Sequence, residues 1–322
     1  MRSSEAPAPM RDVEGRVAFI TGGSSGVGLG IAHAFINAGM KVVIGYLSES
    51  HYDESLKVLG RAGSRLHAIR VDVTDRKDMA AAAAETLKVF GKIHILVNNA
   101  GVAPISSLSS ATYDDWDWCT GVNVNGAFNG IHTFLPYIKS QNEGGHIVTT
   151  ASIFGLAVFR FSQGIYSTTK FAVIGMMEAL RSELASSGIG ASVFCPGPVK
   201  SNISDCNRNR PPTLQQTGEP ATEELAAIEK DKGELPEGVV NDLDSAMADP
   251  LVMGERVLSG IRNNDLYIIS HPEFELTIRD RCEALLASIR QDGTPITAAR
   301  AAAAQLLRNP MYSNELQHKR RD

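Results

Sequence analysis

Tyr166 and Lys170 lie four residues apart in a stretch predicted to be helical. A spacing of four puts both side chains on one face of a helix, about one turn apart. A free phenol has a pKa near about 10 and is a poor base at neutral pH, but a neighbouring ammonium favours the phenolate and lowers that pKa. The pair therefore predicts an acid/base centre at Tyr166. Tyr–Lys pairs with this spacing also occur on helices by chance, so residues elsewhere in the sequence must decide whether this pair is a catalytic centre.

Two further polar residues are predicted to lie near this pair. Ser152 follows a predicted strand, 14 residues before Tyr166, and can donate a hydrogen bond to a carbonyl oxygen. Asn123 lies within a long predicted helix that faces the same edge of the sheet, although a mid-helix asparagine by itself is more often a solvated surface residue. The sequence Asn-Asn-Ala-Gly at 98–101 ends another predicted strand at that edge.

The segment Thr-Gly-Gly-Ser-Ser-Gly-Val-Gly at 21–28 directly follows an apolar strand and opens a predicted helix. Glycines let the backbone turn tightly and approach a pyrophosphate, and the helix N-terminus supplies N–H donors. A glycine-rich loop is a weak signal by itself, with an ordinary strand–helix turn as the alternative. The strand–turn–helix context favours a phosphate-binding loop made by Gly22, Ser24, Ser25, Gly26, Val27 and Gly28.

The ends of the second and third predicted strands bear on which dinucleotide is bound. Asp72, followed by Val73, is placed to meet the adenine edge, and the alternative for it is a strand-end cap. An acid at the end of the second strand would bind the ribose 2′-hydroxyl and repel a 2′-phosphate. The chain has Tyr46 and Ser48 there, so NADP(H) is favoured over NAD(H). Glu49 is close by, however, and no Arg or Lys stands ready to pair with a phosphate.

These residues are distributed over an alternation of strands and helices. Apolar strands are predicted over 17–20, 41–46, 66–71, 93–97, 146–150 and 191–195, between helices over 26–38, 52–61, 75–90, 113–139 and 165–186. Strands with near-continuous apolar faces between helices indicate a parallel sheet covered on both sides. The predicted fold is α/β: a three-layered, doubly wound parallel sheet, or Rossmann fold, with ligands at the carboxyl ends of the strands.

The pattern changes after residue 203. The stretch 203–250 is rich in proline, glycine and acidic residues and is predicted to be a lid insertion. A helix near 252–262, a strand at 266–269 and helices over 273–290 and 298–307 follow. We expect a disordered lead-in over 1–12, one catalytic domain over 13–290 and a C-terminal extension over 291–322. The basic cluster at 318–321 is predicted to be a frayed, solvated tail.

Composition argues against several classes of protein. The 322 residues carry a formal net charge of −5, which gives no electrostatic footprint for nucleic acid or an anionic membrane. Four cysteines lie far apart without metal-ligand spacing, so neither a metal site nor a disulfide framework is expected. No apolar run approaches the roughly 18 residues that span a bilayer, and the first residues do not resemble a signal peptide. We expect a soluble, cytoplasmic protein without nucleic-acid or membrane partners.

Taken in order, these motifs resemble those of the short-chain dehydrogenase/reductase family over about residues 16–203. The resemblance implies that Tyr166 exchanges a proton with the substrate oxygen while Ser152 polarises it. Lys170 would hold the nicotinamide ribose and tune Tyr166, and Asn123 would anchor a water in the proton relay. Further cofactor contacts are implied for Asn99, Ala100, Gly101, Pro196, Gly197, Val199 and Ser201. The interval from Ser152 to Tyr166 is one residue longer than in many family members.

A narrower resemblance is to bacterial Cα-dehydrogenases of lignin β-aryl ethers, in segments 112–118, 200–203, 266–269 and 272–273. Those enzymes oxidise a benzylic secondary alcohol to an aryl ketone, are NAD-linked, and carry an acid where this chain has Tyr46. Phe154, Phe159 and Phe161, with the 203–250 segment, suit a bulky apolar substrate. Packing in a core or an interface is the alternative for these rings.

The sequence thus predicts an oxidoreductase for a bulky, aromatic secondary alcohol/ketone pair. A keto-reductase for acyl, polyketide or steroid-like carbonyls is an alternative with the same chemistry. A dinucleotide-binding regulator without catalysis is a third, against which the complete set of four polar residues argues. The family resemblance also implies a homodimer or homotetramer built on the helices around 115–139 and 166–186.

Overall fold

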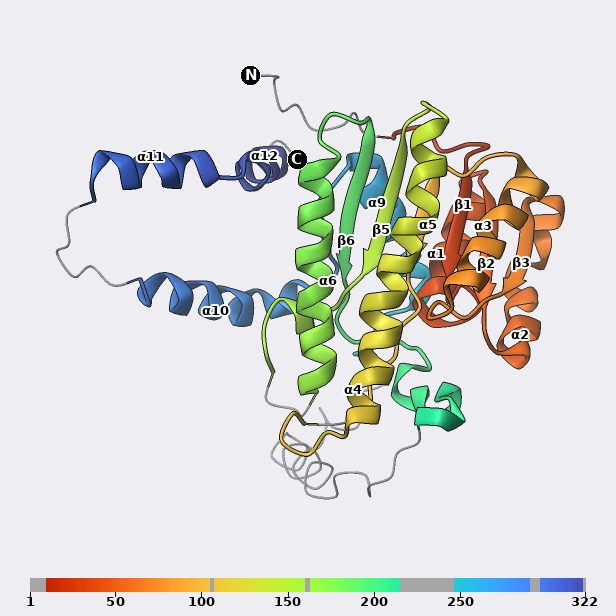
Figure 1. Ribbon diagram of the computed structural model, residues 1–322. Coiled ribbons are helices and arrows are strands. Elements are labelled where there is room, and N and C mark those ends of the chain that lie inside the picture. The colour runs from red at the N-terminus through yellow and green to blue at the C-terminus, as the bar shows by residue number, and fades with distance from the viewer. Residues whose placement is uncertain (1–9, 105–106, 160–162, 215–245, 290–295, 321–322) are drawn as a thin grey trace.

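The computed structural model describes residues 10–104, 107–159, 163–214, 246–289 and 296–320. Seven parallel strands form one sheet in the order β3-β2-β1-β4-β5-β6-β7 (Figure 1). The strands are β1 (Val17–Thr21), β2 (Lys41–Tyr46), β3 (Leu66–Arg70), β4 (Ile95–Asn98), β5 (Gly145–Thr150), β6 (Ile189–Cys195) and β7 (Tyr267–Ile269). The order reverses between β1 and β4, and in open α/β sheets ligands bind at the carboxyl ends of the strands beside such a switch point.

Helices cover both faces of the sheet. One face carries α1 (Gly26–Asn37), α2 (Glu49–Leu59) and α9 (Pro250–Asn263), and the other carries α3 (Arg76–Phe90), α5 (Gly126–Ser140) and α6 (Gly164–Glu183) (Figure 1). Each layer has its own buried cluster, centred on Phe35 and Val257 on one side and on Phe134 and Val173 on the other. The predicted three-layered, doubly wound fold is confirmed.

Two glycines bring α1 and α9 into backbone contact. A Cβ added at Gly30 would lie 1.8 Å from the carbonyl oxygen of Pro250, and one added at Gly254 would lie 2.0 Å from the carbonyl oxygen of Gly30. No side chain fits at either position without moving a helix. The close crossing holds the start of α9 near the loop that follows β1.

The long helix predicted over 113–139 is interrupted. The structure has α4 (Tyr113–Thr120), a π-helical turn at Gly121–Asn125, and then α5. The sequence pattern missed the interruption because the apolar periodicity continues through it, whereas single π turns insert an extra residue and often occur at functional sites. Asn123, in this turn, is 3% exposed and not a surface residue.

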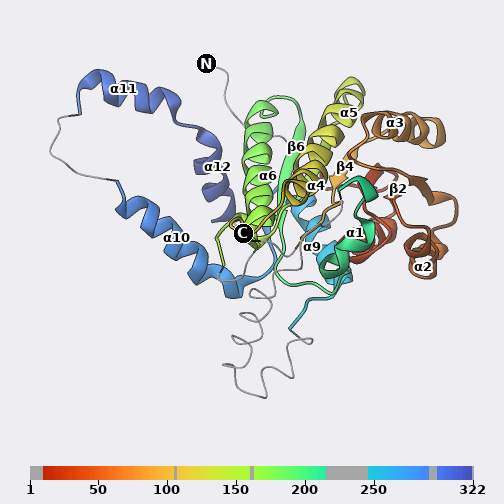
Figure 2. The same ribbon diagram turned by 60° about the horizontal axis from the view of Figure 1, so that its bottom comes forward.

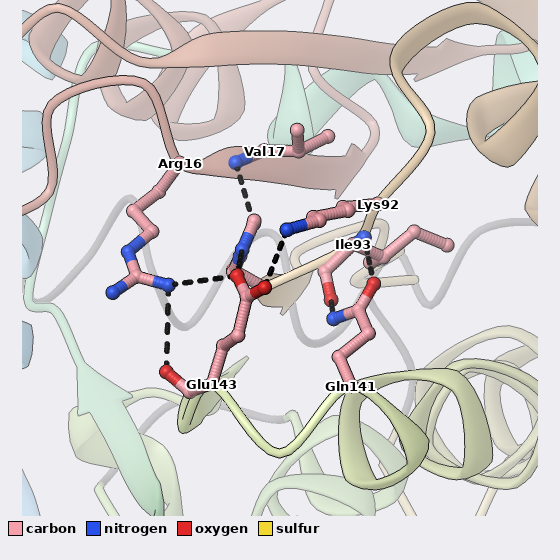
Figure 3. Close-up of polar contacts among 7 residues, drawn as sticks. Arg16, Val17, Lys92, Ile93, Gln141 and Glu143 are labelled. Carbon is pink, nitrogen blue, oxygen red and sulfur yellow. Dashed lines mark hydrogen bonds and ion pairs between the residues drawn. The ribbon is translucent and has the colours of Figure 1, made fainter.

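Glu143 ties together the amino ends of the strands, at the edge opposite the switch point (Figure 3). It accepts hydrogen bonds from Lys92, from Nε2 of His94 at 3.0 Å and from Arg16 at 3.5 Å. His94 Nδ1 in turn accepts from the backbone N–H of Val17 at 3.0 Å. Burial lowers the pKa of His94, which keeps this imidazole neutral and able to accept.

The C-terminal helices predicted after residue 270 are present, but the tail differs from the prediction. Helices α10 (Glu275–Ala287) and α11 (Ala298–Leu307) extend away from the sheet and bury none of their described residues (Figures 1 and 2). An unexpected helix α12 (Pro310–Lys319) returns to the body. His318 and Lys319 pair with Asp265 at 3.2 and 2.7 Å, so the basic cluster is docked and not frayed as far as it is described. No described helix has the length and apolarity to cross a bilayer.

Candidate active site

A cavity of about 470 Å³ opens at the carboxyl ends of β1 and β4. It is lined by residues from the loops that follow every strand from β1 to β6. Of the residues predicted to bind cofactor, the cavity is lined by Gly22, Ser24, Ser25, Gly26, Val27, Tyr46, Ser48, Asp72, Val73, Asn99, Ala100, Gly101, Tyr166, Lys170, Pro196, Gly197, Val199 and Ser201. Residues more than 170 positions apart in sequence therefore converge, as the predicted topology requires.

The glycine-rich loop has the backbone shape that a phosphate site needs. Gly22 and Gly26 have positive φ angles of 62° and 49°, which favour glycine. The side chain of Ser25, at the start of α1, makes no capping hydrogen bond. It therefore does not occupy the backbone N–H groups of the first turn, which are the groups that bind anions at a helix N-terminus. Gly28 does not line the cavity; a Cβ there would lie 2.1 Å from the carbonyl oxygen of Gly22, so it lets the helix pack against the loop. This cradle fits a dinucleotide pyrophosphate.

Thr21 joins the two strand ends at the switch point. Its hydroxyl oxygen accepts hydrogen bonds from the backbone N–H groups of Asn99 at 2.9 Å and Ala100 at 3.0 Å. The Asn99 side chain donates to the carbonyl oxygens of Thr21 and Gly22 at 3.3 Å and accepts from Thr150 at 3.2 Å. The loop after β4 is thereby fixed against the glycine-rich loop.

Ser152, Tyr166 and Lys170 meet at one wall of the cavity. Ser152 follows β5 and begins a short 3₁₀ turn at Ile153–Gly155, whereas the other two residues lie in the first turns of α6. Lys170 Nζ lies 5.3 Å from the centroid of the Tyr166 ring and donates to the carbonyl oxygen of Thr150 at 2.9 Å. All three side chains are buried.

The pKa of Tyr166 differs from the sequence expectation. In this chain burial raises the pKa of Tyr166 to about 12, against the opposing effect of a hydrogen bond from Ser152. Burial also lowers the pKa of Lys170 to about 8. The reason is that both groups are removed from water, which disfavours the phenolate and the ammonium alike. The neutral phenol is therefore the stable form near pH 7.

Asn123 lies behind the cavity wall and does not line it. Its side-chain oxygen accepts from the backbone N–H of Val102 at 2.9 Å, and its nitrogen donates to the Val102 carbonyl at 2.9 Å and to the Thr169 hydroxyl at 3.0 Å. A Cβ added at Gly101 would lie 3.3 Å from the Asn123 oxygen and 3.6 Å from Lys170 Nζ. Asn123 thus connects the loop after β4 to α6, close to the ammonium.

The predicted aromatic residues take different positions. Phe154 lines the cavity and meets the Tyr166 ring edge-on, with centroids 5.9 Å apart. Phe159 does not line the cavity but packs behind Phe154. Its ring centroid is 4.8 Å from that of Phe154 and 5.4 Å from that of Phe274. Phe161 lies outside the described residues. So do residues 215–245 of the predicted 203–250 lid; its ends, 203–214 and 246–250, contribute Cys206 and Met247 to the lining.

At the adenosine end, Asp72 both lines the cavity and caps its own turn. Its side chain accepts from the backbone N–H of Thr74 at 2.9 Å and from the Thr74 hydroxyl at 2.8 Å. Tyr46 stacks on Tyr52 with centroids 4.7 Å apart. Asp72 is the one acidic residue among the described residues of the lining.

Comparison with known proteins agrees with this geometry. Residues 16–211 match the family model described as short chain dehydrogenase. The chain belongs to the short-chain dehydrogenase/reductase family. It is accordingly an NAD(P)-dependent oxidoreductase, as the sequence predicted.

Three relatives of this short-chain dehydrogenase are informative. A C alpha-dehydrogenase of Sphingobium sp. strain SYK-6 is 36% identical over 281 residues, which cover 87% of this chain and 88% of that protein. A 3beta-hydroxysteroid dehydrogenase 2 of Eggerthella lenta is 34% identical over 191 residues, which cover 59% of this chain and 73% of that protein. The crystal structure of a short chain dehydrogenase/reductase from Burkholderia phymatum in complex with NAD is 33% identical, with a TM-score of 0.78, and covers 89% of this chain and 100% of that chain.

The short-chain dehydrogenase also has a wall that sequence reasoning missed. Trp118, on α4, lines the cavity and is 3% exposed, and the guanidinium of Arg210 lies 5.0 Å from the centroid of its ring. Arg210 pairs with Asp115 at 2.6 Å and donates to the carbonyl oxygen of Leu214. This clamp holds segment 203–214 against α4. The only sequence signal was the capping-box pattern of Thr112 and Asp115, which predicts a helix start but no partner.

Proposed function

We propose that the protein is a dehydrogenase/reductase for a bulky, aromatic secondary alcohol/ketone pair that favours NADP(H). The observation that carries the proposal is that Tyr166 and Ser152 share one cavity with the aromatic walls Trp118 and Phe154. Apolar and aromatic walls with a few convergent polar groups are typical of sites for small organic ligands. The name of the C alpha-dehydrogenase relative supports the same substrate class.

The proposed roles follow from charge and reach. A bound dinucleotide would supply or accept the hydride. In reduction, Tyr166 donates its proton to the ketone oxygen while Ser152 donates a hydrogen bond to the same oxygen, so both stabilise the developing alkoxide. Lys170 would hold the ribose of a bound dinucleotide, and its Nζ lies 5.3 Å from the centroid of the Tyr166 ring. Asn123 holds the loop after β4 against α6 through Val102 and Thr169 and, by the family resemblance, anchors a water of the proton relay.

The direction of the two pKa values suits ketone reduction near neutral pH. With its pKa near 12, Tyr166 carries the proton that reduction consumes. Lys170, with a pKa of about 8, is mostly an ammonium at pH 7 and can assist the loss of that proton. Oxidation of the alcohol needs the phenolate, so we expect it to gain relative to reduction as the pH rises.

The preference for NADP(H) rests on the end of β2. An acid there would select against a 2′-phosphate, and this chain presents Tyr46 and Ser48. Glu49 begins α2 but is not among the described residues of the lining. The NAD complex of the related crystal structure supports binding of a nicotinamide dinucleotide in this fold, and NAD(H) is therefore the competing cofactor in the test.

The test is a screen of NADPH and NADH against aryl ketones, with steroid and acyl ketones as the second set. We expect turnover of bulky aryl ketones with NADPH. Faster turnover of the steroid set would favour the alternative reductase, which the name of the Eggerthella lenta relative supports. Tight dinucleotide binding without hydride transfer to any ketone would instead indicate a regulator.

Tyr166→Phe tests the assignment of the proton donor. We expect turnover to fall by about 10³-fold or more with dinucleotide affinity nearly intact, because only the hydroxyl is lost. Tyr113→Phe is the matched control, since Tyr113 is 89% exposed and lies outside the cavity lining. Activity retained by Tyr166→Phe would refute the role.

We further propose a homo-oligomer that packs α5 and α6 against a second copy. Phe128 and Tyr137 on α5 are 52% and 39% exposed, and aromatic side chains are enriched at protein–protein interfaces. Light scattering on the purified chain would show the oligomer, and Phe128→Lys should shift it toward monomers. A monomer for the unaltered chain would contradict the proposal.

A further inference from the structure

His271 lies two residues after the end of β7 and is buried beneath the turn that follows β6. The backbone N–H of Gly197 donates to its Nδ1 at 2.9 Å, and its Nε2 lies 3.2 Å from the carbonyl oxygen of Pro198. The hydroxyl oxygen of Ser270 is also 2.8 Å from Nδ1. Because Nδ1 accepts from Gly197, the ring hydrogen must be on Nε2, which donates to Pro198. His271 therefore holds the turn 196–198 through both of its ring nitrogens.

The fit between the ring and the turn leaves no room for a side chain at Gly197. A Cβ added there would lie 2.7 Å from Cγ of His271 and 3.0 Å from Cε2 of Phe274. Gly197 and its neighbours line the cavity, whereas His271 does not. The histidine thus acts on the site only through the turn.

The turn is joined to the reaction centre on its other side. The carbonyl oxygen of Pro196 accepts from the backbone N–H of Ile153 at 3.0 Å and from the hydroxyl of Ser152 at 3.4 Å. A continuous route therefore leads from His271 through the turn to Ser152. It lies partly outside the residues that match the family model, which end at 211.

We infer that His271 is a positioning residue of the active site: it fixes the turn 196–198 and, through the hydrogen bond from Ile153 to Pro196, the start of the segment that carries Ser152. The inference rests on the proposed function, since it assigns a purpose to the alignment of Ser152 and the turn. A buried acceptor in a fixed orientation keeps the reacting groups within the narrow range of distances and angles that hydride transfer requires.

The two hydrogen bonds between His271 and the turn 196–198 are not equivalent. The carbonyl oxygen of Pro198 also accepts from the backbone N–H of Ala248 at 3.0 Å. Among the described residues, Gly197 N–H has its acceptor in His271 Nδ1. Losing that acceptor leaves a partly buried donor unpaired, which is the more costly defect.

This asymmetry gives a test with matched variants. The amide oxygen of His271→Asn can take the acceptor position of Nδ1, whereas the longer side chain of His271→Gln brings its amide near the position of Nε2, where it can donate to Pro198, and His271→Leu has neither group. We expect kcat to fall about tenfold for the Leu and Gln variants, equivalent to about 1.4 kcal/mol in the barrier, and less than about threefold for the Asn variant. The primary isotope effect with deuterium-labelled reduced dinucleotide should rise in the impaired variants, because the chemical step becomes slower.

His67→Leu is the control for loss of a partly exposed histidine that does not line the cavity and that pairs with Glu85 at 2.6 Å. Emission of the bound reduced nicotinamide is measured in all variants and tests the inference even without turnover. A shift in the Leu and Gln variants but not in the Asn variant would support it. Equal kcat and emission in all variants, or equal impairment of the Asn and Gln variants, would overturn it. Failure of the unaltered protein to reduce any ketone would instead refute the proposed function.

Discussion

The clamp between Asp115 and Arg210 offers the sharpest test of how segment 203–214 is held. Each side chain is 6% exposed and their charged atoms are 2.6 Å apart. Removing one partner of a buried ion pair leaves the other charge desolvated and typically costs about 3–5 kcal/mol. Asp115 also accepts from the backbone N–H and hydroxyl groups of Thr112, so its charge is partly compensated. We therefore expect Arg210→Met to cost about 2–3 kcal/mol in the free energy of unfolding and Asp115→Asn about 3 kcal/mol.

The double variant carries the information about the pair. With both charges removed, no unpaired charge remains in the buried site. The double variant should therefore lose about 2 kcal/mol less free energy of unfolding than the sum of the two single variants. The assay is urea unfolding followed by tryptophan fluorescence, because Trp118 contacts Arg210. The Trp116→Phe background makes Trp118 the only tryptophan, since the chain has two.

An exposed pair on α10 is the matched control. The side chains of Glu275 and Arg279 are 68% and 57% exposed, and their charged atoms are 2.5 Å apart. Exposed pairs of this kind contribute less than about 0.5 kcal/mol to the free energy of unfolding. The reasoning from burial would be refuted if Arg210→Met lowered the free energy of unfolding no more than Arg279→Met. It would also be refuted if the losses of the two single variants at 115 and 210 simply added in the double variant. A raised KM for the ketone with an unchanged KM for the dinucleotide would further show that the clamp forms the substrate side of the cavity.

Three other predictions follow from contacts in the fold. Tyr46→Asp should shift the ratio of kcat/KM toward NAD(H), and an unchanged ratio would remove Tyr46 from cofactor selection. Gly30→Ala should destabilise the fold by about 3 kcal/mol or more in urea unfolding, because its Cβ would overlap the carbonyl oxygen of Pro250, whereas Gly60→Ala, where a Cβ meets nothing within 4 Å, should be tolerated. Hydrogen bonds from Lys92 and His94 lower the pKa of Glu143 to about 2, so its contribution to stability is full above its ordinary pKa of 4.5 and is lost as the pH falls through about 2. The difference in melting temperature between the protein and Glu143→Gln should therefore narrow in acid, and a constant difference would contradict this.

The sequence by itself determined the sheet and the groups gathered at its carboxyl edge. Apolar strands alternating with helices have few arrangements available, because parallel crossovers are right-handed and short. Residues that follow successive strands, such as Gly22, Asn99 and Ser152, must then share one edge. Local patterns sufficed because each of these residues is defined by its position within one strand–loop–helix unit.

Only the tertiary structure decided which groups support that edge. Gly197 and His271 are 74 residues apart, and Asp115 and Arg210 are 95 apart, so no local spacing links either pair. The raised pKa of Tyr166 and the buried position of Asn123 likewise depend on what packs around them. Burial, hydrogen-bond acceptors and ion-pair partners are properties of packing between distant segments, and periodicity along the chain carries no record of them.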